Sequence, residues 1–306
     1  MEQRRIGSLE VSVVGIGCNN FGARLDQEGT TAVVEAALDA GINLFDTADI
    51  YGGTKSEVML GQALGSRRDE AIVASKFGLP SEHTAGGGHP DYVVASCEAS
   101  LKRLGTDHLD LYQFHCPDPS VPLEDTIAAM QGLVEAGKVV EIGCSNFSPE
   151  LLHEAKAKAG EGPTFASVQN QYSLLWREPE EGVLDTCAQL GIGLLPFYPL
   201  ANGLLTGKFQ PGTAPASGTR LAMMDEARSA HWMGEAMLER VEGLIAFAAD
   251  QEVPLLDLAF AWILDHAEVP SVIAGASSPA QVAANAAAGA VKLSAEQRSA
   301  LDALTS

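Results

Sequence analysis

Short apolar runs alternate with longer amphipathic stretches along the whole chain. The apolar runs predict strands at residues 11–17, 42–45, 71–75, 109–114, 139–143, 167–169, 192–195 and 271–273. The stretches between them predict helices, of which the clearest lie at residues 31–40, 55–64, 91–104 and 123–135. Glycines end several of these helices, and Ser148-Pro149-Glu150 is typical of a further helix start, so the boundaries agree with the periodicity.

The ends of the predicted strands recur at a nearly constant interval. Six successive intervals are 26 to 39 residues long, which suits one strand followed by one helix, and the seventh is 78 residues long. Strands that alternate with helices form a parallel sheet, and eight such units in about 300 residues predict an α/β fold, the (β/α)8 TIM barrel. The strand ends that we count are Gly17, Asp46, Lys76, His115, Cys144, Asn170, Phe197 and Gly275.

Two additions to this barrel are predicted. The long last interval places an insertion between strands 7 and 8, with a loop at residues 203–218 and extra helices at residues 235–249 and 254–266. Residues 4–13, around Gly7-Ser8, predict an N-terminal β-hairpin that would plug the bottom of the barrel. No linker interrupts the rhythm of strands and helices, so we expect residues 1–306 to form a single domain.

Composition limits the classes of function. The chain has 306 residues, 46% of them hydrophobic, and 19 Lys and Arg against 40 Asp and Glu give a net charge of -21. The apolar fraction excludes a disordered chain, and the charge argues against nucleic acid and against an anionic membrane as partners. The five cysteines include no C-x-x-C pair, and neither a signal peptide nor a membrane-spanning run is present. We therefore expect a soluble cytoplasmic protein with reduced thiols.

Polar side chains stand at the ends of three neighbouring predicted strands. Asp46, Lys76 and His115 end the second, third and fourth strands, and Tyr51 lies just beyond the second. Barrel enzymes carry their active sites at the carboxyl ends of the strands. A buried lysine and a buried aspartate are costly apart and tolerable as a pair, so a structural ion pair beside a satisfied histidine is the alternative interpretation.

Together these four residues suit the proton half of a carbonyl reduction. A phenol is a weak acid at neutral pH, and the neighbouring ammonium is expected to lower the pKa of Tyr51. Asp46 would hold Lys76 charged, and His115 would orient a carbonyl or share the proton. The resulting group can protonate a developing alkoxide, while the hydride must come from elsewhere. No set of Asp, Glu, His and Cys has metal-ligand spacing across these strands, so we expect no metal.

At these residues the sequence strongly resembles the aldo-keto reductase superfamily, and the resemblance extends from the Arg4 hairpin to Asn285. Its most specific motif is Asp46-Thr47-Ala48-x-x-Tyr51-Gly52. The resemblance implies that Tyr51 is the general acid of an NADP-dependent aldo-keto reductase. Such an enzyme reduces small-molecule aldehydes or ketones, or in reverse acts as an alcohol dehydrogenase. The implied catalytic tetrad is Asp46, Tyr51, Lys76 and His115.

The resemblance also implies a nicotinamide cofactor bound across the barrel mouth without a Rossmann fold. Ser145, Asn146 and Gln169 match the residues that hold its carboxamide, although such a turn can also satisfy its own backbone. The family usually has Tyr or Trp stacked on the nicotinamide where this chain has Phe197, so either Phe197 or Tyr198 would supply the ring. The residues that match the pyrophosphate loop are Leu200, Asn202, Leu204 and Lys208.

The adenosine end of the expected cofactor site is uncharged. Gly275, Ser277 and Gln281 stand where the family often has Lys or Arg, and such a cation usually holds a 2′-phosphate. The Ser277 and Ser278 hydroxyls and the N-terminus of a helix that starts at Pro279 remain as donors. Asn285 would face the adenine amine. We expect NADP(H), as in the family, with NAD(H) as the alternative.

The expected substrate pocket lies over the tetrad. Four residues are candidates for its walls by position, with core packing as the alternative: Phe21, Ile50, Phe77 and Cys116. Four residues of the insertion would form a lid over the pocket or cover the side of the barrel: Met223, Met224, Trp232 and Met233.

Two other functions stay open. Some members of the family serve as nucleotide-sensing regulatory subunits of membrane channels, so a nicotinamide-nucleotide-binding subunit is the main alternative. A barrel lyase or isomerase that uses Lys76 for a Schiff base is the other. Nothing in the sequence implies an obligate assembly, and we expect a monomer.

Overall fold

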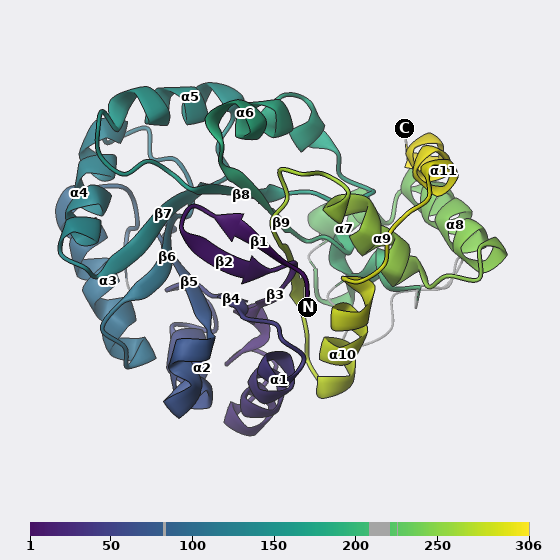
Figure 1. Ribbon diagram of the computed structural model, residues 1–306, viewed down its shortest axis with the longest axis horizontal. Helices are drawn as coiled ribbons and strands as arrows, with labels where there is room; N and C mark the ends of the chain where they lie inside the picture. Colours follow the sequence, from purple (N-terminus) through teal and green to yellow (C-terminus); the bar gives the residue numbers. More distant parts are fainter. Residues whose placement is uncertain (82–83, 208–220, 225, 306) are drawn as a thin grey trace.

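Eight parallel strands form a nearly closed barrel in the computed structural model, which describes residues 1–81, 84–207, 221–224 and 226–305 (Figure 1). The strands pair in the order β10-β3-β4-β5-β6-β7-β8-β9. Where the barrel closes, the Leu194 N–H of β9 donates to the Glu268 carbonyl just before β10, at 2.7 Å. The strands are β3 (Val14–Gly17), β4 (Leu44–Asp46), β5 (Ile72–Phe77), β6 (Leu109–Phe114), β7 (Val139–Ser145), β8 (Ser167–Gln171), β9 (Gly193–Phe197) and β10 (Val272–Gly275). The predicted (β/α)8 barrel is confirmed.

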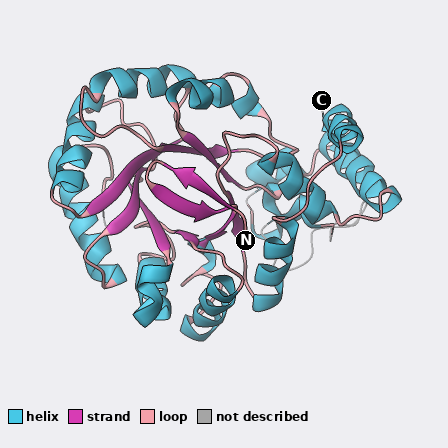
Figure 2. Cartoon of the chain, viewed as in Figure 1, coloured by secondary structure: helices cyan, strands magenta, loops and turns pink. Residues whose placement is uncertain are grey.

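Helices lie around the outside of the barrel (Figure 2). They are α1 (Gln27–Asp39), α2 (Lys55–Leu64), α3 (Pro90–Leu104), α4 (Leu123–Glu135), α5 (Pro149–Lys158), α6 (Val183–Leu190), α9 (Leu255–Leu264) and α10 (Pro279–Ala288). α1 begins at Gln27 rather than at residue 31 because the Asp26 carboxylate caps it, accepting the Gly29 N–H at 2.9 Å. No helix among the described residues is long and apolar enough to cross a membrane.

The N-terminal hairpin closes one end of the barrel (Figure 1). Its strands β1 (Gln3–Ile6) and β2 (Leu9–Ser12) pair antiparallel, as predicted. Ile6, Leu9 and Val11 are buried in one cluster with side chains from the barrel strands, so the hairpin seals the interior from below. The Arg4 guanidinium fixes the hairpin further by donating to the carbonyls of Leu264, His266 and Val269.

The insertion before β10 contains α7 (Glu226–Trp232) and α8 (Glu235–Asp250), and α8 lies beside the C-terminal helix α11 (Ala295–Thr305) (Figure 1). Trp232 is buried, with its ring centroid 6.3 Å from that of Trp176 in the segment after β8. Met224 and Met233 pack against the core. These side chains therefore pack onto the body of the protein, and a lid over the pocket stays a prediction. The Met223 side chain and most of the predicted loop at 203–218 lie outside the described residues.

Inward-facing residues alternate along each strand and form layers. Leu44, Ala74 and Leu111 belong to the apolar layer that the hairpin covers. Two residues further along the same strands, the inward positions are Asp46, Lys76 and Gln113. In register, Asp46 pairs with Ala74 and Lys76 with Gln113, so the inward positions become polar two residues earlier on β4 than on β5 and β6.

Close helix packing at Gly61 generates a prediction about stability. A Cβ atom on Gly61 of α2 would lie 2.1 Å from the Leu104 carbonyl oxygen at the end of α3. We expect Gly61→Ala to lower the free energy of unfolding by about 1–3 kcal/mol, because backbone must move to admit the methyl group. Urea unfolding followed by circular dichroism measures this.

Gly132→Ala in α4 is the matched control, since a Cβ there meets no atom within 4 Å. Helix propensity alone predicts that this change stabilises the protein by up to about 1 kcal/mol. Equal effects of the two substitutions would contradict the packing of α2 against α3.

Candidate active site

The four predicted catalytic residues meet at the carboxyl end of the barrel, around the buried ammonium of Lys76. This side chain is 0% exposed on β5, and its Nζ donates to Asp46 Oδ2 at 2.7 Å, to the Thr47 carbonyl at 2.8 Å and to the Tyr51 hydroxyl at 3.5 Å. The same Nζ lies 5.0 Å from the centroid of the Tyr51 ring. The chain Asp46–Lys76–Tyr51 is therefore continuous, with Asp46 and Lys76 buried and Tyr51 partly exposed.

A second oxygen of Asp46 is held by two amides. Oδ1 accepts from Gln113 Nε2 at 3.1 Å and from Gln169 Nε2 at 2.9 Å. Sequence reasoning missed Gln113, although it lies two residues after the inward-facing Leu111 on β6 and therefore faces inward as well. Gly143 on β7 leaves room for the Gln113 side chain. A Cβ atom at position 143 would crowd it, since it would lie only 3.3 Å from Gln113 Cγ.

Gln169 has a different contact from the predicted one. We expected its amide to hold the carboxamide of a cofactor, whereas in the structure Nε2 donates to Asp46 and, at 3.3 Å, to Gln113 Oε1. The side chain thus joins the predicted cofactor site to the tetrad. Its contact with a cofactor stays a prediction.

His115 is held neutral. Its ring meets the Tyr51 ring edge-on, with centroids 6.1 Å apart. Burial and then the nearby Lys76 ammonium lower the pKa of His115 from 6.5 to about 3. Nδ1 is buried and has no hydrogen-bond partner among the described residues. A neutral imidazole can orient an oxygen, but it carries no second proton to give.

The pKa of Tyr51 is raised above 10.0: Lys76 lowers it, as expected, but burial outweighs that effect. Burial is the largest cause, since it disfavours the phenolate. The Lys76 ammonium opposes this effect but is itself offset by the Asp46 carboxylate beside it. Lys76 stays charged: burial lowers its pKa, yet Asp46 and Tyr51 outweigh burial and leave the pKa above 10.5.

Ser145 and Asn146 tie the ends of neighbouring strands together. Ser145 Oγ donates to the Gln169 carbonyl at 2.7 Å, and Asn146 Nδ2 donates to the His115 carbonyl at 2.9 Å. Asn146 adopts φ +61°, a left-handed conformation that asparagine tolerates. Both side chains therefore satisfy backbone groups at the barrel mouth, which agrees with the alternative interpretation of this turn.

The segment after β9 exposes a ring and buries an unsatisfied amide. Phe197 is partly exposed and Tyr198 is 37% exposed, with their ring centroids 5.2 Å apart. Asn202 is only 9% exposed and adopts φ +58°, and both of its amide atoms lack partners among the described residues. Leu200 is partly buried, whereas Leu204 is fully buried in the core and presents no side-chain surface. Lys208 lies outside the described residues.

The predicted adenosine end lies at the N-terminus of α10. Ser278 caps the helix, and Gln281 folds back so that its Oε1 accepts from the Ser277 N–H at 2.8 Å and from the Ser277 hydroxyl at 3.1 Å. Gly275 is exposed at the end of β10. Asn285 is buried, and its Nδ2 lacks a partner within the described part of the chain. Since buried polar groups are nearly always bonded, such orphaned amides suit a ligand.

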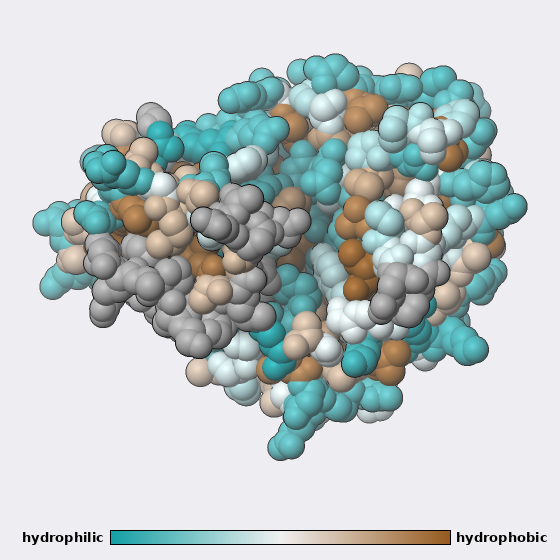
Figure 3. Space-filling view, turned by 180° about the vertical axis from the view of Figure 1, so that it is seen from behind, coloured by the Kyte–Doolittle hydropathy of each residue, from teal (hydrophilic) through white to brown (hydrophobic). Residues whose placement is uncertain are grey.

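Two of the four candidates for the substrate pocket belong to the core. Phe21 and Phe77 are 0% exposed, and Phe77 stacks on Tyr112 and Phe114, so neither presents a surface to a substrate in this structure. Ile50 and Cys116 are partly exposed and stay candidates. Seen from behind, opposite the view with the hairpin in front, the molecule has a groove with apolar residues along one wall (Figure 3).

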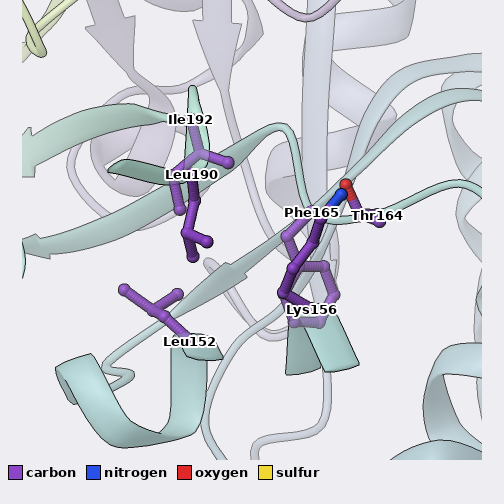
Figure 4. A pocket seen from close by; sticks show the side chains of 6 residues that line it. All are labelled: Leu152, Lys156, Thr164, Phe165, Leu190 and Ile192. Carbon is purple, nitrogen blue, oxygen red and sulfur yellow. The ribbon is translucent and has the colours of Figure 1, made fainter. Parts of the chain in front are cut away.

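No cluster of His, Cys, Asp and Glu among the described residues could hold a metal ion. A small apolar hollow lies at the opposite end of β8 and β9 (Figure 4). Its volume of about 10 Å³ admits a water molecule and no substrate. It is lined by Leu152, Lys156, Thr164, Phe165, Leu190 and Ile192.

Comparison with known proteins agrees with this geometry. The sequence profile described as Aldo/keto reductase family matches residues 13–306. A protein of Glycine max named "Probable aldo-keto reductase 1" is 35% identical over 294 residues, which cover 94% of this chain and 83% of that protein. An Arabidopsis thaliana protein named "Probable voltage-gated potassium channel subunit beta" is 33% identical over 299 residues, covering 93% of this chain and 90% of its own.

A solved structure matches along the whole chain. It is the holo form of aldo-keto reductase AKR11C1 from Bacillus halodurans, with a TM-score of 0.84 and 31% sequence identity, covering 100% of this chain and 97% of that chain. The profile, the relatives and the solved structure all indicate one family. The chain belongs to the aldo/keto reductase family.

Proposed function

We propose that the protein is an NADP(H)-dependent oxidoreductase that reversibly reduces aldehyde or ketone carbonyls to alcohols, with Tyr51 as the proton donor. The observation that carries this proposal is the buried chain Asp46–Lys76–Tyr51, with links of 2.7 Å and 3.5 Å, beside a neutral His115. A structural ion pair alone requires neither the tyrosine nor the histidine. Tyr51 and His115 lie together at the carboxyl end of the barrel, with ring centroids 6.1 Å apart.

The proton step follows from the geometry of these side chains. Bound cofactor supplies the hydride. Because the pKa of Tyr51 is raised, its proton is in place at neutral pH before a substrate arrives. As negative charge develops on the carbonyl oxygen, Tyr51 protonates it, and the Lys76 ammonium stabilises the phenolate that remains. His115 orients the carbonyl oxygen through its neutral ring.

The residues at the barrel mouth fit a nicotinamide cofactor. The unsatisfied amides of Asn202 and Asn285 provide buried donors and acceptors, and Gly203 adopts φ +103°, which opens backbone to an approaching phosphate. Ser145, Asn146 and Gln169 stand together where a carboxamide would bind beside the tetrad. NADP(H) is favoured as the cofactor over NAD(H) by membership of the family.

A second function has a specific observation in its favour. Relatives from Arabidopsis thaliana and from rice, each 33% identical, carry the name of a potassium channel beta subunit. A nucleotide-binding regulatory subunit would bind NADPH and show no turnover with any carbonyl. A panel of aldehydes and ketones assayed with NADPH and with NADH separates the two functions, and we expect turnover.

Tyr51→Phe removes the proton donor and leaves the ring. We expect kcat to fall by about 10²–10⁴-fold, the usual contribution of a general acid. The Kd of NADPH, measured by quenching of tryptophan fluorescence, should stay unchanged because the hydroxyl serves the substrate. Turnover at the wild-type rate would refute the assignment of Tyr51.

Lys76→Met removes the charge that stabilises the phenolate, so carbonyl reduction should stop. It also leaves Asp46 buried without its cation, which is expected to cost about 3–5 kcal/mol of stability. The double variant Lys76→Met with Asp46→Asn removes both charges and serves as the control. We expect it to regain stability in urea unfolding and to stay inactive, whereas recovered activity would show that Lys76 is structural.

Gln281→Arg tests the adenosine end. Wild-type protein should bind NADPH more tightly than NADH, but the margin should be small because Ser277, Ser278 and Gln281 carry no charge. An arginine at position 281 adds a charged donor, worth about 1.5–3 kcal/mol, so the Kd of NADPH should fall at least tenfold. The Kd of NADH is the internal control and should not change; an equal gain for both cofactors would contradict the placement.

A further inference from the structure

Two buried carboxylates behind the catalytic lysine have no part in the mechanism above. Asp49 lies in the motif between Asp46 and Tyr51 and is 6% exposed, and Glu57 in the first turn of α2 is 0% exposed. Two carboxylates out of water and close enough to perturb each other are costly unless both are neutralised. Their surroundings show which of the two is satisfied.

Glu57 is fully bonded. Its Oε1 accepts from the Ser75 hydroxyl of β5 at 2.5 Å, and its Oε2 accepts from Arg103 Nε of α3, also at 2.5 Å. Arg103 donates in addition to the Ser100 hydroxyl. The guanidinium is therefore committed to Glu57.

Asp49 is poorly bonded. Its Oδ2 accepts a single long hydrogen bond, 3.4 Å, from the Tyr92 hydroxyl of α3. Its Oδ1 is buried and has no partner among the described residues. An ionised carboxylate in this setting has lost water without gaining donors, so the protonated form is favoured.

The backbone links Asp49 directly to the catalytic groups. The Asp49 N–H donates to the carbonyl of Lys76 at 3.2 Å, and the Tyr51 N–H donates to the carbonyl of Ala48 at the same distance. The segment then continues into α2, where the Ser56 N–H donates to the Tyr51 carbonyl. A displacement of Asp49 would thus be transmitted to Tyr51 on one side and to the Lys76 backbone on the other.

We propose that Asp49 is a positioning residue for Tyr51 whose protonated form holds residues 47–56 against β5 and whose ionised form is repelled by Glu57 and loosens that segment. The inference rests on the proposed role of Tyr51 as proton donor and adds a residue that controls its placement. Asp49 is 6% exposed, so we assign it no contact with substrate or cofactor.

The electrostatics of the cluster place this titration at neutral pH. Burial, and then the Glu57 carboxylate, raise the pKa of Asp49 from 3.8 to about 7, against the opposing effects of Arg103 and the Tyr92 hydroxyl. The groups that face Asp49 are Glu57 of α2, Arg103 and Tyr92 of α3, and the buried phenol of Tyr112 on β6. None of the last three supplies a free cation to an ionised Asp49: Arg103 is taken by Glu57, and the two tyrosines present hydroxyl groups.

Linkage gives a sign that can be measured without turnover. Between about pH 4 and pH 7 the unfolded chain has lost the Asp49 proton while the folded chain keeps it, so the contribution of Asp49 to stability decreases as pH rises through that window. Asp49→Asn removes this titration while preserving the shape of a neutral acid. The midpoint of urea unfolding should therefore fall less between pH 5 and about pH 8 in Asp49→Asn than in the wild type.

The effect on Tyr51 is measured through the resonance of its own ring. With isotopically labelled tyrosine, the ring resonance of Tyr51, assigned by its loss in Tyr51→Phe, should shift with a midpoint near pH 7 in the wild type and not in Asp49→Asn. Single-turnover reduction of para-nitrobenzaldehyde by NADPH should show the same midpoint, with the rate falling at higher pH, while the Kd of NADPH stays constant. The fall should be lost in Asp49→Asn.

Two further variants keep the test decisive. Tyr92→Phe removes a donor to the ionised form and should move both midpoints to higher pH, so it answers the question even where Asp49→Asn folds poorly. Asp69→Asn, which removes an exposed carboxylate, is the charge-matched control and should leave both unchanged. A Tyr51 resonance that titrates identically in the wild type and in Asp49→Asn or Tyr92→Phe would overturn the proposal. Absence of turnover with an Asp49-dependent Tyr51 resonance would overturn the proposed function instead.

Discussion

The ion pair between Lys76 and Asp46 is the constraint on which the rest of the site depends. An ammonium has three protons to donate, and the structure gives each of them one acceptor: Asp46, the Thr47 carbonyl and the Tyr51 hydroxyl. A fully buried ammonium is costly unless each of its N–H donors has an acceptor. The position of Tyr51 is therefore part of the solution to burying Lys76, and of the three acceptors Tyr51 is the one whose own proton is available for chemistry.

Asp46 imposes a matching requirement on the opposite side of the barrel. Its second oxygen takes the amides of Gln113 and Gln169, which come from β6 and β8. These donors hold the Asp46 carboxylate beside Lys76, and its negative charge offsets part of the effect of the ammonium on Tyr51. Burial then dominates, and the pKa of Tyr51 rises rather than falls. In the proposed function, an ion pair that stabilises a phenolate during turnover is thus compatible with a phenol that keeps its proton at rest.

How far the sequence predicts such a site depends on the range of the interactions involved. Strand spacing predicts the barrel, and because the carboxyl ends of its strands meet, it also brings Asp46, Lys76 and His115 together. Alternation along β6 is enough to find Gln113 inside the barrel, but its contact with Asp46 crosses two strands and depends on Gly143 having no side chain. Phe77 lies next to Lys76 in sequence and faces the core in space, since alternate residues of a strand point to opposite sides. The sign of a pKa shift is the least predictable quantity, because it is a small balance between burial and several charges.

The net charge of -21 raises the question of how the barrel mouth would hold a phosphate-bearing cofactor. In the proposed function a phosphate-bearing cofactor binds to a strongly acidic chain, so its contacts must come from dipoles and uncharged donors, which act at short range and do not depend on net charge. At the N-terminus of α10 one such donor, the Ser277 N–H, is already taken by Gln281 Oε1. A 2′-phosphate there would compete with a carbonyl of the protein itself, unless the Gln281 amide turns and presents its Nε2 instead. Gln281 has both an acceptor and a donor end, and the choice between them decides whether this end of the site opposes or accepts the extra phosphate.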